Sequence, residues 1–154
     1  MIELPKLAIL SEEILTSYDG AAPAPARGQL AAIIMKLFHA IALGDFAAAG
    51  ESLTDDIDFA ILASHVAFPV RRAVGREAVL AAFKMNFGVV AEQEHELVWL
   101  VEDGARCIMV FHERGRSLAL GTAYEGYGTF VFEVRDGRVA MVREITADSA
   151  PPRI

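Results

Sequence analysis

The C-terminal part of the chain alternates between strand-like runs and tight turns. Four runs rich in β-branched and aromatic residues occupy residues 92–102, 105–113, 122–134 and 138–146. The first and third runs end at Asp103-Gly104 and Asp136-Gly137, and the second ends at Arg114-Gly115-Arg116. Asp-Gly pairs are strong hairpin signals because such turns need positive φ. The pattern predicts a curved antiparallel meander with one face that other elements must cover.

The segment upstream of the meander carries helical periodicity. Residues 27–43 place apolar side chains at helical spacing, namely Leu30, Ile33, Ile34, Leu37, Phe38 and Ile41. Gly44 fits the stop of this helix, and Asp45 fits the N-cap of a shorter one over residues 46–53. A third helix is predicted over residues 76–87.

Two strands are predicted between the second and third helices. One covers residues 57–62 and a short one covers residues 67–72, which Pro69 restricts to a sheet edge or a bulge. The order of elements predicts an α+β fold, in which a curved antiparallel sheet with a mixed edge wraps around about three N-terminal helices.

The length of 154 residues suits one domain with a proper core. Residues 21–26, with two prolines, form an Ala/Pro linker that no helix can cross. We therefore expect an N-terminal extension over residues 1–26, a domain over residues 27–148 and a tail over residues 149–154. The extension would cover a pocket, extend a dimer or stay disordered, and the pattern does not choose between these.

Composition excludes several classes of partner. A net charge of −7 with 54% hydrophobic residues argues for a globular protein and against binding to a phosphate backbone. The single cysteine, Cys107, lies mid-strand with apolar neighbours on one side, which favours a buried inert thiol, and a lone cysteine favours a reducing compartment. No apolar run approaches the roughly 20 residues of a membrane span, and no signal-peptide pattern opens the chain. We expect a soluble, cytoplasmic protein that binds neither nucleic acid nor membrane.

Four local stretches resemble one known superfamily. They are LFHAIALGDF over residues 37–46, TDDIDF over 54–59, GREAV over 75–79 and REI over 143–145. With the order of elements, they resemble the nuclear-transport-factor-2-like superfamily, which includes ketosteroid isomerases, limonene epoxide hydrolases and SnoaL-like polyketide cyclases. The resemblance covers residues 27–148. It implies a cone with an apolar pocket for a small apolar organic ligand, no cofactor, and a homodimer formed through the outer face of the sheet.

The resemblance also argues against a steroid isomerase. Such enzymes place a Tyr, an Asp base and an Asp donor where this chain has Leu37, Ile61 and Gly128. The residues expected to line the pocket are Leu37, Ile61, His65, Gly126, Gly128, Phe130 and Val142. Gly126 and Gly128 would curve the sheet and leave room for a ligand.

Glu144 is the candidate catalytic residue that the resemblance singles out. Epoxide hydrolases of this superfamily carry a catalytic Asp at this position of the final strand, inside the cone. A carboxylate in an apolar cavity has a raised pKa, so it can exchange protons near neutral pH. Alternatively, Glu144 is satisfied by a neighbouring Arg or faces solvent on the dimer side.

His112 and Tyr124 are the expected catalytic partners of Glu144. His112, on the second strand of the meander, would shuttle protons or orient a water, unless it is simply exposed near the turn. Tyr124 shares the strand parity of Phe130 and would donate its hydroxyl to a substrate oxygen, although an aromatic on a sheet is more often core. His65 lies in the loop expected at the mouth of the cone, or is an exposed loop residue.

The remaining histidines predict no metal site. His65, His95 and His112 are far apart in sequence, and none has the spacing of a helical ligand pair. His95 and Trp99 have the same parity, so we expect them to share one buried face, although which face is left open.

Two functional hypotheses follow. The first is a cofactor-free isomerase, cyclase or hydrolase with Glu144 as the acid/base. The alternative is a non-catalytic ligand-binding or dimerisation module, which the absence of the three isomerase groups favours.

Overall fold

A computed structural model describes residues 28–147, and the predictions for residues 1–26 and 149–154 lie outside this range. The helices are α2 (Gln29–Ala42), α3 (Phe46–Glu51) and α4 (Arg76–Phe87). The strands are β1 (Leu53–Ala63), β2 (Arg72–Val74), β3 (Val90–Asp103), β4 (Arg106–Ser117), β5 (Ala123–Arg135) and β6 (Arg138–Ala147). None of the helices in the described range is long and apolar enough to cross a membrane.

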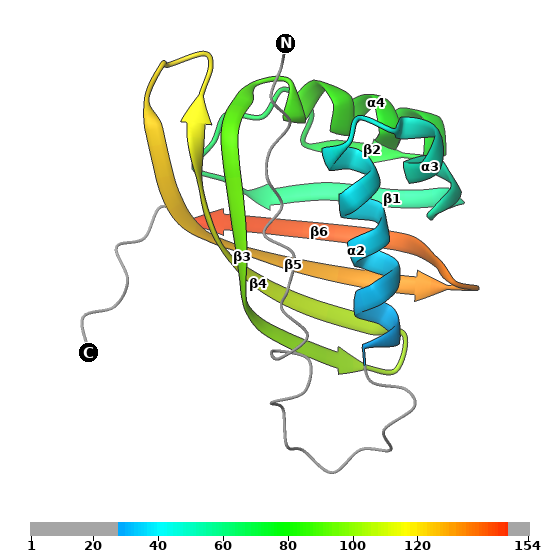
Figure 1. Cartoon of the computed structure of the whole chain (residues 1–154). Coiled ribbons are helices and arrows are strands. Elements are labelled where there is room, and N and C mark those ends of the chain that lie inside the picture. The colour runs from blue at the N-terminus through cyan, green and yellow to red at the C-terminus, as the bar shows by residue number, and fades with distance from the viewer. Residues whose placement is uncertain (1–27, 148–154) are drawn as a thin grey trace.

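The strands form one curved sheet with the order β2-β1-β6-β5-β4-β3. The β1–β6 pair is parallel and the other pairs are antiparallel. Figure 1 shows α2 crossing the strands on one face, with α3 and α4 gathered beside β1 and β2. The predicted α+β fold, with helices segregated to one face of a mixed sheet, is confirmed.

The two Asp-Gly turns are confirmed, but the expected break at Arg114-Gly115-Arg116 is wrong. Gly104, Asp136 and Gly137 all have positive φ, as tight hairpin turns require. β4 instead continues to Ser117, and Gly115 pairs with Tyr124 inside the ladder. A Cβ at residue 115 would lie 2.7 Å from the Tyr124 hydroxyl oxygen. Glycine is therefore present to make room for an aromatic ring, not to turn the chain.

The segment around Pro69 also differs from the prediction. The short strand covers Arg72–Val74 rather than residues 67–72. The Asn86 side chain on α4 takes both backbone groups of Val70, accepting from its N–H at 3.0 Å and donating to its carbonyl at 2.8 Å. Because the amide of Asn86 occupies these groups, residue 70 is not available for strand pairing.

The preceding strand, β1, starts at Leu53 instead of residue 57, so Asp55 and Asp56 are exposed strand residues.

Carboxylates fix the starts of the first two described helices. Asp45 accepts a hydrogen bond from the Ala48 N–H at 3.0 Å, which confirms its predicted role as N-cap of α3. Glu102, at the end of β3, accepts from the N–H groups of Gly28 and Ala31 at 3.0 and 2.8 Å. A negative charge at a helix N-terminus is favourable, and this contact also ties α2 to the sheet.

The core lies between α2 and the inner face of the sheet. Its largest fully buried side chains are Phe132, Ile34, Leu37, Leu53, Ile57, Met109, Val79, Val139 and Cys107. Burial raises the pKa of the Cys107 thiol to about 12, so the reactive thiolate is suppressed.

An irregularity in β3 separates His95 from Trp99. The register with β4 shifts between Leu97 and Trp99, which is a β-bulge. One extra residue reverses the alternation of every side chain beyond it. His95 therefore faces inward with its side chain 14% exposed, whereas Trp99 faces outward and is 52% exposed. The expectation that the two residues share a face is wrong.

Candidate functional site

A cavity lies between α2, α4 and the inner face of the sheet. Its volume is about 70 Å³, enough for several waters or part of a small organic molecule. Within residues 28–147 its lining includes eight phenylalanines, namely Phe38, Phe59, Phe68, Phe83, Phe87, Phe111, Phe130 and Phe132. Its polar lining residues are Asn86, Gln93, His95, Glu113 and Glu144. The cavity is thus an aromatic chamber with a few polar groups, as ligand sites usually are.

Glu144 lines this cavity from β6. It is flanked by Ile61 on the parallel strand β1 and by Phe130 on the antiparallel strand β5, so its backbone is fixed on both sides. Burial raises the pKa of Glu144 to about 8, and the negative charge of Glu113 adds to the effect. A carboxyl group with this pKa holds and releases a proton near neutral pH.

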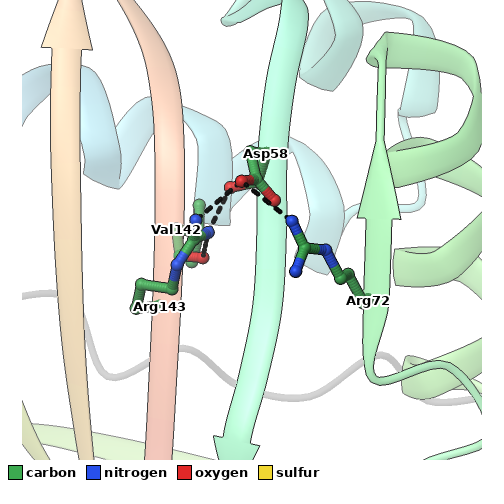
Figure 2. Close-up of polar contacts among 4 residues, drawn as sticks. All are labelled: Asp58, Arg72, Val142 and Arg143. Carbon is green, nitrogen blue, oxygen red and sulfur yellow. Dashed lines mark hydrogen bonds and ion pairs between the residues drawn. The ribbon is translucent and has the colours of Figure 1, made fainter.

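Arg143, next to Glu144 in sequence, points to the other face of the sheet. Figure 2 shows its guanidinium reaching Asp58 on β1, with Nη2 donating to Oδ2 at 2.7 Å and Nη1 donating to the Asp58 carbonyl at 2.8 Å. Arg72 approaches the same carboxylate at 3.6 Å. Arg143 is therefore held by Asp58, and the alternative in which a neighbouring Arg satisfies Glu144 does not describe this arrangement.

A second carboxylate, Glu113 on β4, shares the cavity with Glu144. Its side chain is only 7% exposed, and its Oε2 lies 3.3 Å from Nε2 of His95. Nδ1 of His95 is buried and has no hydrogen-bond partner in the described part of the chain. The site thus contains a carboxylate–imidazole pair beside the Glu144 carboxyl group, which has no ion-pair partner within residues 28–147.

His112 lies on the opposite face of β4 from Glu113. Its Nε2 is 2.9 Å from Oε1 of Glu125, and its ring packs against Tyr127 with centroids 5.2 Å apart. Side chains alternate along a strand, so a residue next to Glu113 cannot also reach the cavity. The structure does not bring His112 together with Glu144, and we leave it out of the proposed site.

Tyr124 has the inward parity expected from Phe130 but lies behind the cavity lining. Gln93 Nε2 donates a hydrogen bond to its hydroxyl oxygen at 2.8 Å. Burial raises the pKa of Tyr124 to about 12, and the charges of Glu113 and Glu144 also raise it, against the lowering effect of the Gln93 hydrogen bond. The phenol therefore keeps its proton, which it can donate.

The predicted pocket residues fall into two groups. Leu37, Ile61, Phe130 and Val142 line the cavity. His65, Gly126 and Gly128 do not, because the chain's own atoms fill the space beside the glycines. A Cβ at residue 126 would overlap the carbonyl oxygen of Ala147 and lie 3.3 Å from the His65 ring, and one at residue 128 would lie 2.9 Å from the Phe130 ring.

With this geometry established, comparison with known proteins identifies the family. The profile of the SnoaL-like domain matches residues 34–142. The chain belongs to the SnoaL-like family. A comparison with curated proteins finds no match.

Several solved structures share the fold of this chain. A putative SnoaL-like polyketide cyclase from Jannaschia sp. CCS1 is 19% identical, with 86% of this chain and 100% of that chain covered and a TM-score of 0.69. A protein described as NTF2-like from Burkholderia xenovorans LB400 is 21% identical over 78% and 90% of the two chains, with a TM-score of 0.66. An LEH-like epoxide hydrolase from M. tuberculosis is 18% identical over 77% and 83%, with a TM-score of 0.61. At these identities the likeness shows the fold alone.

The polar groups of this SnoaL-like domain are suited to proton transfer. Glu144 can gain and lose a proton, the Glu113 carboxylate lies 3.3 Å from the His95 imidazole, and Tyr124 remains a neutral phenol. Among the residues that the structure describes, no three His, Cys, Asp or Glu side chains are grouped to hold a metal ion.

Proposed function

We propose that the protein binds a small apolar organic molecule in the aromatic cavity and transfers a proton with Glu144, without a cofactor. One observation carries this proposal: the Glu144 carboxyl lines an apolar cavity, and burial together with Glu113 raises its pKa to about 8. A carboxyl with a pKa near the working pH is an effective general acid or base. The reaction would be an isomerisation, a cyclisation or a hydrolysis.

Glu113 and His95 would support Glu144 in this role. The charge of Glu113 helps to keep the proton on Glu144, and His95, 3.3 Å from Glu113, orients the second carboxylate. Two carboxylates with different environments are a recurrent arrangement for dividing acid and base roles. The descriptions of the fold neighbours as a polyketide cyclase and an epoxide hydrolase are compatible with such chemistry.

The test combines a direct titration with a kinetic comparison. Carbon-13 NMR of the glutamate side chains should show one carboxyl titrating near pH 8, and Glu144→Gln should remove that signal. For any epoxide or enolisable ketone that the protein turns over, Glu144→Gln should lower kcat by a factor of about 10² or more. Glu133→Gln, which changes an outward carboxylate paired with Arg106, should behave as wild type.

The alternative is a binding module that performs no chemistry on its ligand. It uses the same cavity, so ligand binding would survive while no substrate is found. Turnover that is unchanged in Glu144→Gln, or a Glu144 carboxyl that titrates below about pH 6, would remove Glu144 from the acid/base role and favour this alternative.

We also propose that the protein forms a homodimer through the outer face of the sheet. Leu62, Trp99 and Ile145 project from this face and are exposed in the single chain. Exposed apolar patches of this kind commonly mark protein interfaces. Sedimentation velocity should show a dimer that Trp99→Lys dissociates, whereas Leu120→Lys, in the turn after β4, should leave it intact. A monomeric wild type would contradict the dimer.

A further inference from the structure

The charges that face the cavity are unbalanced. Glu113 and Glu144 both line it, and among residues 28–147 the one basic group beside them is the imidazole of His95. Neither lysine nor arginine contributes to the lining, as far as the structure describes the chain. When both carboxyl groups are ionised, the site therefore carries at least one uncompensated negative charge even with His95 protonated.

No other group in the described chain is placed to neutralise this charge. Arg143 is bound to Asp58 on the far face of the sheet, and His112 is bound to Glu125 there. An uncompensated charge in an apolar cavity is costly, and a bound cation would offset that cost. The rest of the lining is also suited to a cation, because the faces of aromatic rings attract positive charge.

We infer that the cavity is selective for apolar molecules that carry a protonated amine, with the ammonium group held between Glu113 and Glu144 and the apolar part among the phenylalanine rings. The inference rests on the proposed use of this cavity as a small-molecule site and adds the chemical class of its ligand. A neutral isostere would bind more weakly, because it leaves the carboxylates unbalanced. A carboxylate ligand would be excluded, because it adds a third negative charge.

Amine affinity should depend on pH in a defined direction. Glu144 must be ionised to pair with the ammonium, and its pKa of about 8 means that amine binding displaces a proton below that pH. Amine affinity should therefore rise between pH 6 and pH 8 and level off above, since an alkylammonium resembles Lys and keeps its proton to about pH 10.

The titratable groups that face Glu144 are consistent with an amine affinity that rises with pH. They are Glu113 on β4, His95 on β3, Tyr124 on β5, whose proton is held up to about pH 12, and His65 beside Tyr124. The helices contribute Leu37, Phe38, Ile41, Phe83, Asn86 and Phe87, which do not titrate.

The test uses three probes matched in shape: 2-phenylethylamine, 2-phenylethanol and phenylacetate. Isothermal titration calorimetry at pH 8 should give the amine an affinity at least tenfold above that of the alcohol, and phenylacetate should not bind. The amine's affinity should fall by about tenfold per pH unit at most on going to pH 6, while the alcohol's stays flat. Methyl NMR shifts should move for Ile61 in the cavity and not for Leu62 on the outer face.

Two isosteric variants test directly whether the carboxylates select the amine. Glu144→Gln should reduce the amine's advantage over the alcohol to about twofold or less and abolish its pH dependence, and Glu113→Gln should reduce it in part. Glu133→Gln should bind the amine and the alcohol as wild type does and should still not bind phenylacetate. An alcohol or carboxylate that binds as tightly as the amine, an amine advantage over the alcohol that is undiminished in Glu144→Gln, or no amine binding at millimolar concentration would overturn the proposal. The titration and turnover tests of Glu144 above do not depend on this ligand, so the two failures are distinguishable.

Discussion

Arg143 and Glu144 are consecutive residues on β6, yet they lie in opposite electrostatic surroundings. Arg143 faces outward, where three of its hydrogen bonds go to Asp58 and Val142. Glu144 faces inward, where burial raises its pKa to about 8. Because side chains alternate along the strand, Arg143 is hydrogen-bonded on the outer face, whereas the ionised form of Glu144 is destabilised by burial on the inner face.

The comparison teaches why a basic neighbour in sequence does not neutralise an acid in a sheet. The backbone of β6 separates the two side chains, and its pairing with β1 and β5 prevents either from rotating to the other face. Glu144 is therefore held in a costly environment by the stability of the surrounding sheet. Such costs are typical of functional sites, where the reactive group is destabilised and the scaffold supplies the compensation.

The largest expected effect comes from removing the inward charge. Glu144 has a pKa of about 8 in the folded protein and an ordinary value of 4.5, so between these pH values the folded state keeps a proton that the unfolded state releases. Stability therefore falls as pH rises from about 5 to 8. Glu144→Gln should remove this loss, and its free energy of unfolding relative to wild type should increase by about 4 kcal/mol between pH 5 and pH 9.

Urea denaturation at fixed protein concentration, followed at both pH values, measures this difference. The concentration must be constant because dimer formation would itself contribute to stability. Glu133→Gln, which keeps Glu144 and changes an outer-face carboxylate paired with Arg106, should differ from wild type by the same free energy of unfolding at both pH values. If Glu144→Gln and wild type respond equally to pH, the carboxyl of Glu144 is not destabilised by burial and the contrast between the two faces fails.

The fold could be predicted from the sequence because the patterns that indicate its helices and hairpins are local. Apolar side chains at helical spacing predicted α2, Asp45 predicted the start of α3, and the Asp-Gly pairs predicted two hairpins. These signals depend on neighbours within a few residues. The end of β4 was not predicted, because Gly115 serves a contact with Tyr124 on another strand.

The candidate site was harder to predict from the sequence, because strand parity decides which side chains face the cavity. The sequence predicts His112 as the site residue on β4, whereas the structure places Glu113 at the cavity. Both faces of β4 are apolar in the residues that precede this pair: Cys107 and Met109 face inward, while Ile108 and Val110 face outward. Without a polar alternation, the sequence does not say which set is buried. In β3 the bulge after Leu97 reverses the parity, so His95 could not be assigned from Trp99.

The smaller expected effect comes from breaking the outward pair. Side chains of Asp58 and Arg143 are 30% and 25% exposed, so solvent screens their attraction only in part. A double-mutant cycle with Asp58→Asn and Arg143→Met should give a coupling energy of about 0.5–1.5 kcal/mol by urea denaturation. Arg143→Met alone should cost more than Asp58→Asn, because it also leaves the Asp58 carbonyl without its donor. Neither variant should change amine binding in the cavity. A coupling energy near zero would show that the outward pair does not stabilise the fold, and a loss of amine binding as large as that of Glu144→Gln would show that the two faces of β6 are not independent.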